Sequence, residues 1–202
     1  MEWDWKGEYR EHLLMREKLK REPSEKNFKK MIEQCHDTIY YYWHAAIDME
    51  KYKDVVQTYE TTAVAFWKKY KTTESLYHVV YFYGDFNFVM RIYRMDAEPD
   101  QLLEHMKKGI LYAQLYHEKV NKDYSAALLI RLYRSIYEIR QAEGLVYLKQ
   151  ACSVAKEWTH RLKTPFLMNE YAWVSYEAQM DADRVRWKDK KKKQEAEQVA
   201  EA

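Results

Sequence analysis

Residues 39–62 read IYYYWHAAIDMEKYKDVVQTYETT, and this stretch decides the fold class. Its first half repeats apolar residues at the spacing of one helical face: Ile39, Tyr42, Trp43 and Ala46. Its second half does the same: Tyr52, Val55, Tyr59 and Thr62. A short polar segment, residues 48–51, separates the two patterns. Two amphipathic helices joined by so few residues predict an antiparallel helical hairpin.

The composition of the chain supports few, long helices. Of 202 residues 47% are hydrophobic, which is enough to bury a core, and only four are Gly and three are Pro. The net charge is +2, so charge alone does not indicate a nucleic-acid-binding protein. We therefore expect an all-α fold of stacked antiparallel hairpins, a short α-solenoid of about eight helices.

Helical periodicity and stop signals divide the chain into eight segments. We expect helices over residues 3–20, 24–49, 51–70, 72–95, 99–119, 124–142, 145–162 and 165–187. Ser24 and Thr164 are candidate N-caps, Pro99 fits a first helical position, and Gly144 punctuates two helices. Residues 1–187 are predicted to form a single helical-repeat domain, and residues 188–202 a charged C-terminal tail that frays.

The segment 79–89 supports two interpretations. Its β-forming residues surround the pair Gly84-Asp85, which by local rules favours a β-hairpin. A lone hairpin among helices would have no sheet to join, so we favour a helix that is kinked at Gly84.

Three predicted hairpins repeat at about 48 and then 45 residues, counted from Val55 to Leu103 to Leu148. The pattern of large and small residues at positions 43, 46, 52, 55, 59 and 62 resembles the tetratricopeptide repeat. The period is longer than in that family, and Val55 and Thr62 stand where alanines are usual. Long-helix variants of this kind are similar to the peptide-sensing domains of Gram-positive regulators and related phage proteins. Residues 1–22 are too short for the helix-turn-helix that such regulators usually carry.

Tyrosine and arginine on the first helix of each hairpin suggest a binding face. Ten of the nineteen tyrosines fall there, and in a stacked-hairpin solenoid the first helices line the concave surface. The proposed contacts are Tyr41, His44, Tyr81, Arg91, Arg131, Arg134 and Tyr137. We expect a non-enzymatic regulator or adaptor that binds a protein or peptide segment. The competing interpretation is that such tyrosines belong to the core and that the arginines lie on a solvated face balanced by Glu138.

Two other classes of function stay open. A nucleic-acid-associated subunit could use the same residues together with the lysine run at 188–193. A ferritin-like di-metal oxidase, the weakest alternative, could use Glu33 with His36 and Glu157 with His160. Those residues fall largely off the apolar faces, so we expect no metal and no other cofactor. A homodimer is a further alternative, because Trp3, Trp5 and the last helix form aromatic-rich ends.

The remaining signals indicate no enzyme and no membrane protein. The sequence has no Gly-rich phosphate loop and no catalytic HExxH or Gly-x-Ser-x-Gly motif. Cys35 and Cys152 lie on apolar positions and are expected to be reduced core thiols. With neither a signal-peptide pattern nor a long apolar run, the expected location is cytoplasmic.

Overall fold

The computed structural model describes residues 4–42, 48–86, 99–139 and 141–200, and every regular element within these ranges is helical. They form eight α-helices and one π-helical turn, which confirms the all-α fold class. The chain divides into two compact units, Met1–Tyr93 and Arg94–Ala202, here called unit 1 and unit 2. The expectation of one domain over residues 1–187 stays a prediction.

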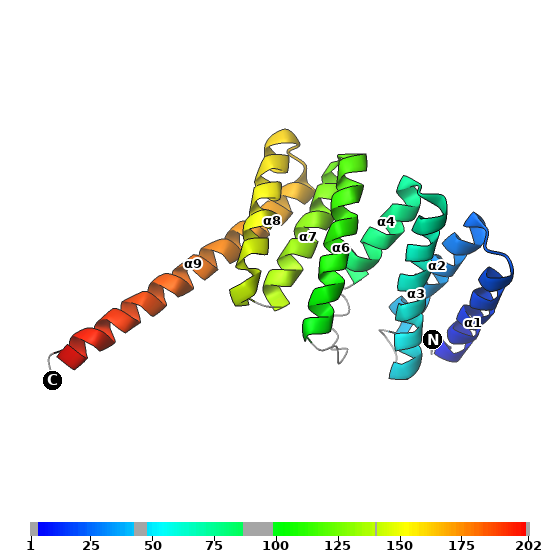
Figure 1. Ribbon diagram of the computed structural model, residues 1–202, viewed down its shortest axis with the longest axis horizontal. Helices are drawn as coiled ribbons and strands as arrows, with labels where there is room; N and C mark the ends of the chain where they lie inside the picture. Colours follow the sequence, from blue (N-terminus) through cyan, green and yellow to red (C-terminus); the bar gives the residue numbers. More distant parts are fainter. Residues whose placement is uncertain (1–3, 43–47, 87–98, 140, 201–202) are drawn as a thin grey trace. The chain divides into compact units, whose positions relative to one another are not determined.

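Unit 1 consists of helices that pack in sequence order. They are α1 (Trp5–Arg21), α2 (Glu25–Tyr42), α3 (Met49–Tyr70) and α4 (Thr73–Tyr81), followed by the π turn η1 (Phe82–Phe86). α1 packs on α2, α2 on α3 and α3 on α4. Successive helices run in opposite directions, so the unit is a series of antiparallel hairpins (Figure 1).

The predicted apolar stripe of residues 52–62 forms the core of unit 1. Tyr52, Val55, Tyr59 and Thr62 are all buried in α3. On the facing side, Met31 and Cys35 of α2 have no exposed surface. Burial of one continuous stripe from each helix is what holds such hairpins together, because isolated helices of this length are marginal in water.

The ambiguous segment is helical as far as the structure describes it. α4 ends at Tyr81 and continues directly into the π turn, which contains Gly84. A π turn contains one extra residue compared with a regular α-helical turn. This irregularity lies where the sequence predicted a kink, at Gly84. The helix interpretation is therefore confirmed for Val79–Phe86, and residues 87–89 lie outside the described ranges.

Short polar side chains begin several helices by accepting orphan backbone N–H groups. The Ser24 hydroxyl accepts from the Asn27 amide at 3.3 Å, and the Thr164 hydroxyl accepts from the Leu167 amide at 3.4 Å, as expected. Asp48 and Thr72 cap α3 and α4 in the same way.

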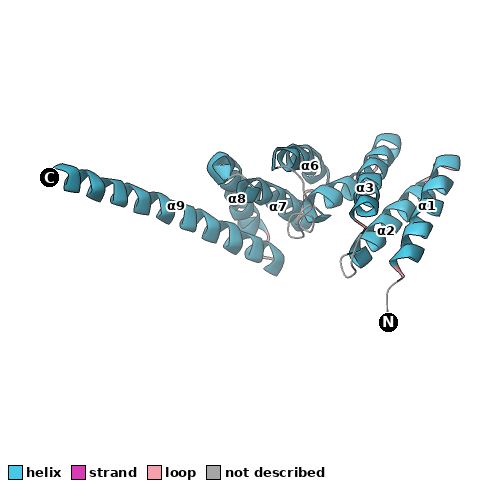
Figure 2. Ribbon diagram, turned by 90° about the horizontal axis from the view of Figure 1, so that it is seen from below, coloured by secondary structure: helices cyan, strands magenta, loops and turns pink. Residues whose placement is uncertain are grey.

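Unit 2 consists of α6 (Pro99–Val120), α7 (Asp123–Ile139), α8 (Gln141–Arg161) and α9 (Pro165–Ala200). Pro99 begins α6, as predicted. α7 is buried along most of its length because α6, α8 and α9 all pack against it. Figure 2 shows the same helices from below.

One expectation about a helix end was wrong. Gly144 does not separate helices but lies within the first turn of α8, which starts at Gln141. A Cβ atom at Gly144 would lie 2.4 Å from the Tyr137 Cα atom, so the glycine is needed for the close approach of α7 and α8. α9 continues through the charged segment after Lys188 as far as Ala200, and Lys, Glu, Gln and Ala there all favour helix, so fraying of this segment stays a prediction.

Candidate functional site

The predicted site residues divide between the two units. Tyr81 lies on α4 in unit 1, whereas Arg131, Arg134 and Tyr137 lie on α7 in unit 2. His44 and Arg91 lie outside the described residues, as does the side chain of Tyr41. The structure thus brings together three of the seven residues, all on one helix.

Arg131 and Arg134 bind an internal carboxylate. The Arg131 Nε atom lies 2.8 Å from Glu170 Oε1, and Arg134 Nη1 lies 3.4 Å from Glu170 Oε2. The Glu170 side chain, on α9, is only 5% exposed. Arg134 also pairs with Glu138 at 3.2 Å, the balancing charge anticipated from the sequence. This arrangement fastens α9 to α7 and satisfies the carboxylate that α9 buries.

The third α7 residue also pairs with α9. Tyr137 is 1% exposed, and its hydroxyl donates to Asp181 Oδ1 at 3.2 Å. Burial and the Asp181 charge raise the pKa of the Tyr137 phenol. Tyr137 is therefore a core residue with a polar contact at its tip.

Two more of the ten tyrosines follow the core interpretation. Tyr83 and Tyr133 are 2% and 5% exposed. The Tyr83 hydroxyl donates to Glu60 Oε1 at 2.6 Å, and the Tyr133 hydroxyl accepts from Gln114 at 3.0 Å. Large tyrosine rings in a core with their hydroxyls paired contribute packing and specificity rather than a binding surface.

Tyr81 lies in a partly exposed aromatic group. Its ring centroid is 5.8 Å from that of Tyr77 and 6.0 Å from that of His36 on α2. Tyr77 and Tyr81 are half-buried, and His36 is exposed. Among the described tyrosines of the predicted face, Tyr77 and Tyr81 of this group and Tyr124, which is 39% exposed, keep accessible surface.

The two Glu/His pairs lie in different compact units. The Glu33/His36 pair lies on α2 and the Glu157/His160 pair on α8, in different units, and all four side chains are exposed. Across the described ranges, no three His, Cys, Asp or Glu side chains are grouped closely enough to hold a metal ion.

A polar cluster that the sequence did not single out joins α1 to α3. Asp54 accepts from the Tyr9 hydroxyl at 2.9 Å and from Arg16 Nη1 at 2.8 Å. His12 is fully buried beside it, with Nε2 3.9 Å from Asp54 Oδ2 and Nδ1 3.8 Å from Cys35 Sγ. Tyr9, His12 and Arg16 are spaced three and four residues apart, so their shared helical face was readable, but their partner Asp54 on another helix was not.

The Cys35–His12–Asp54 order resembles a nucleophile, base and orienting carboxylate, yet the chemistry does not support catalysis. Burial raises the pKa of the Cys35 thiol, and burial lowers the pKa of His12 to about 4. A neutral imidazole beside a buried thiol gives no thiolate at neutral pH, and Cys35 has no exposed surface for a substrate. By contrast Cys152, expected in the core, is only partly buried.

A groove of about 560 Å³ opens beside this polar cluster. We call it the α1/α3 groove, because α1 and α3 form its sides and Phe28 of α2 lies on its floor. Its α3 side presents residues from one helical face: Asp54, Gln57, Thr58, Thr61, Thr62 and Ala65. Its other side is formed by Arg16, Leu19, Lys20 and Pro23.

Comparison with known proteins identifies no family. No protein-family model matches the sequence, and no curated protein matches it. A de novo designed helical repeat protein, DHR64, aligns with 90% of this chain and 94% of its own at 11% identity and a TM-score of 0.38. The DHF119 filament aligns with 90% of this chain and 95% of its own at 10% identity and the same TM-score. Such low values establish neither a family nor a function, and the tetratricopeptide resemblance stays a prediction.

Proposed function

We propose that this chain is a non-enzymatic helical-hairpin module that binds a protein or peptide segment in the α1/α3 groove. The observation that supports the proposal is the groove itself, whose volume of about 560 Å³ is in the usual range of ligand-binding clefts. The groove is open to solvent rather than enclosed, which suits a segment of chain that continues beyond it at both ends.

The lining of the groove suits a peptide better than a wholly apolar ligand. Leu19, Phe28 and Ala65 offer apolar contacts. The side chains of Gln57, Thr58, Thr61 and Thr62 line its α3 side. Peptide backbone carries a donor and an acceptor at each residue, so a side of alternating small polar groups and an apolar floor can match it.

One end of the groove is charged. The Arg16 and Asp54 side chains are 32% and 35% exposed, so their ion pair is only partly shielded from solvent. A charged group of the bound segment could exchange with one member of this pair, which would fix the direction in which the segment lies. The ion pair and the polar cluster behind it keep this end of the groove in place.

The accessible group formed by Tyr77, Tyr81 and His36 supports a second contact surface for the same kind of partner. Tyrosine offers a large apolar area together with a hydroxyl, at a low cost in side-chain entropy. This aromatic group lies on α2 and α4, whereas the groove lies between α1 and α3. The earlier assignment of Arg131 and Arg134 to ligand binding would require them to give up Glu170, so the groove supports the proposal better.

Selection from a displayed random-peptide library tests the proposal. Ala65 is exposed on the groove wall, and Ala65→Arg would fill the groove without disturbing the core. Thr73→Arg introduces the same side chain at an exposed site away from the groove and serves as the matched control. We expect peptides selected on the wild-type chain to bind the control equally and to bind Ala65→Arg at least about tenfold more weakly. Failure to enrich any peptide, or equal binding to both variants, would contradict the proposal.

The nucleic-acid alternative predicts a different response to salt. Neutralising phosphates with lysine and arginine releases counterions, so affinity would fall steeply between low and physiological salt. Binding in the α1/α3 groove should weaken much less over that range, because it relies mainly on apolar and hydrogen-bonding contacts and on at most one charge pair that salt can screen. Measuring the affinity of the selected peptide and of a random-sequence oligonucleotide at two salt concentrations separates the two functions.

A further inference from the structure

The long helix α9 carries a row of exposed large side chains, of which Trp173 is partly covered by the Arg134 guanidinium of α7, 5.3 Å from its ring centroid. Trp173, Tyr176, Met180 and Trp187 are 49%, 59%, 36% and 64% exposed. We call these four residues the α9 stripe. Large apolar side chains exposed in a continuous row are uncommon on a monomer surface and mark interaction sites.

The four residues share one face of the helix. They are spaced three, four and seven residues apart, which is the heptad spacing of a coiled-coil seam. The face by which α9 packs on α7 and α8 is a different one, formed by residues such as Leu167 and Val174 that have no exposed surface. The stripe is therefore additional to the packing that holds α9 in unit 2.

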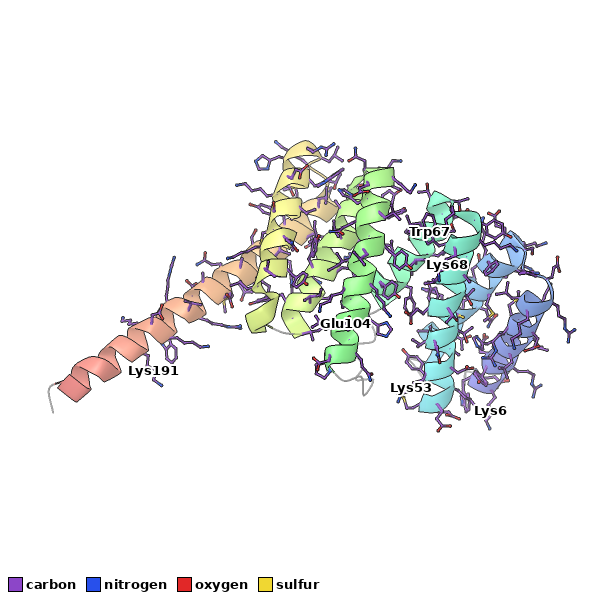
Figure 3. The ribbon with its side chains drawn as sticks, viewed as in Figure 1. Lys6, Lys53, Trp67, Lys68, Glu104 and Lys191 are labelled. Atoms are coloured by element: carbon purple, nitrogen blue, oxygen red, sulfur yellow. The ribbon has the colours of Figure 1, made fainter. Side chains whose placement is uncertain are left out.

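The second half of α9 leaves the body of unit 2. Figure 1 shows α9 continuing past the ends of α7 and α8, and Figure 3 places Lys191 on the projecting part. Every described side chain from Asp183 to Lys191 is exposed. A projecting helix with only itself for support is marginal in water, so a partner along this segment would stabilise it.

The stripe has the symmetry of a self-complementary surface. Met180 lies midway, seven residues after Trp173 and seven before Trp187. If two copies of α9 lie antiparallel with the two-fold axis at Met180, each Trp173 faces the partner subunit's Trp187. This is the isologous arrangement of a symmetric dimer, in which one patch meets its own copy.

The charges along α9 favour a second copy in the antiparallel direction. Residues 165–183 contain four acidic side chains and no basic one, whereas residues 184–193 contain seven basic side chains and one acidic. Glu170 and Asp181 already contact α7, so the acidic side chains that count toward a partner are Glu177 and Asp183. An antiparallel pair places the acidic half of one helix beside the basic half of the other. Beside the stripe, Glu177 would lie next to the partner subunit's Arg184, and Arg184 would lie next to the partner subunit's Glu177. A parallel pair would place like charges side by side.

We propose that two copies of this chain associate through antiparallel pairing of their α9 stripes. The occupant is a second copy because Trp173 and Trp187 lie symmetrically about Met180 and because the charge pattern of α9 is complementary to itself when reversed. Tyr176 has no symmetric counterpart in the stripe, since the residue four positions after Met180 is Arg184. This inference does not depend on the α1/α3 groove, which lies in unit 1.

The oligomeric state of matched variants tests the inference. Trp187→Glu places a charge in the stripe, and Val185→Glu places one on another face of the same projecting segment, where Val185 is 51% exposed. By native mass spectrometry and light scattering we expect twice the 24.8 kDa chain mass for the wild type and for Val185→Glu. Trp187→Glu should raise the dissociation constant at least about tenfold. Because neither side chain packs in the core, circular dichroism should show the same helicity in all three.

Exchange of charges tests the pairing across the two-fold axis. Arg184→Glu alone should weaken the dimer, because Glu177 would then face an acidic side chain. Adding Glu177→Arg to Arg184→Glu reverses both members of the pair and should restore most of the lost affinity. A double variant that is as weak as the single variant would overturn the antiparallel register.

Cysteine cross-linking tests the direction. At the two-fold axis, Met180→Cys should form a disulfide between copies under mild oxidation. Lys191→Cys should not, because in an antiparallel pair its two copies would be about 33 Å apart along the helix axis. The unsubstituted chain controls for the native Cys35 and Cys152.

Three outcomes would overturn the inference. One is a monomer at concentrations up to about 100 µM. Another is a dimer that Trp187→Glu leaves intact. The third is cross-linking through Lys191→Cys as efficient as through Met180→Cys. A monomer that instead binds anionic lipid vesicles through the stripe would assign the surface to a membrane and equally exclude the dimer.

Discussion

Glu170 shows how one buried charge can hold two helices together, here α9 and α7. Its carboxylate is 5% exposed and is satisfied by two arginines of α7. Taking a carboxylate out of water is costly, and here the cost is offset by the charge-assisted contacts with Arg131 and Arg134. The arginines therefore act on the stability of unit 2.

Replacing Arg131 and Arg134 together by Ala should lower the free energy of unfolding by about 3–5 kcal/mol, because Glu170 would be left buried and unpaired. Arg161→Ala, which removes an exposed pair with Glu157, is the control and should change stability by less than about 1 kcal/mol. Urea unfolding followed by circular dichroism measures both. A double variant as stable as the control would show that Glu170 finds other partners.

His12 should make unit 1 sensitive to acid. In the unfolded chain its pKa is near the ordinary histidine value of 6.5, whereas burial in the folded state lowers the pKa to about 4. Between these values the unfolded chain binds a proton that the folded chain does not, so stability falls as pH falls from 6.5 to 4. We expect this loss to be of order 2 kcal/mol.

Urea midpoints measured from pH 7 to pH 4 check the His12 prediction. His12→Gln should be less stable at neutral pH but should show a smaller loss over this window, because Gln does not titrate. His160→Gln, at an exposed site, should retain the wild-type pH dependence. If stability falls with pH equally in the wild type and in His12→Gln, His12 is not the cause of the acid sensitivity.

At the scale of elements, the close contact between α7 and α8 depends on a residue without a side chain. In an exposed helix, Gly→Ala stabilises by up to about 1 kcal/mol. At Gly144 the new methyl group would meet the Tyr137 backbone at 2.4 Å, and a backbone cannot rotate away as a side chain can. Packing should therefore override helix propensity.

We expect Gly144→Ala to lower the free energy of unfolding by about 1–3 kcal/mol, the usual cost of overpacking. Gly7→Ala is the matched control, because its added Cβ atom would meet only the Asp4 carboxylate, a side chain that can move. The Asp4 cap of α1 would then be the only interaction disturbed, so we expect a change below about 1 kcal/mol. Thermal unfolding of both variants decides whether the approach of α7 to α8 is as tight as described.

At the scale of the whole molecule, the chain divides into two compact units. A destabilising substitution in one unit should then act mainly within it. For Gly144→Ala we expect faster hydrogen exchange in α7, α8 and α9 and unchanged exchange in α2 and α3. Hydrogen-exchange mass spectrometry resolves these segments. Equal acceleration in both units would support the single domain expected over residues 1–187.

No described helix is long and apolar enough to cross a membrane. The two proposals, self-association through α9 and peptide binding in the α1/α3 groove, combine at this scale. Each copy in a dimer would carry its own groove. Dimerisation would then present two grooves to a partner with two binding segments, which raises apparent affinity without any new contact.

The sequence by itself determined the helices and most of their boundaries. Apolar spacing predicted the buried stripe of α3, and Ser24, Thr164 and Pro99 marked helix starts. These signals are local, since periodicity and capping involve residues within one or two turns of each other. It also identified Arg131, Arg134 and Tyr137 as neighbours on one helical face.

Only the tertiary structure decided what those residues contact. Glu170 and Asp181 on α9 pair with α7 across more than thirty residues of sequence, and Asp54 on α3 joins Tyr9 and Arg16 on α1. From its local sequence Gly144 is predicted to end a helix, whereas the packing of α7 against α8 keeps it inside α8. The physical reason is the same in each case: periodicity shows which face of a helix is apolar, but not which helix that face meets.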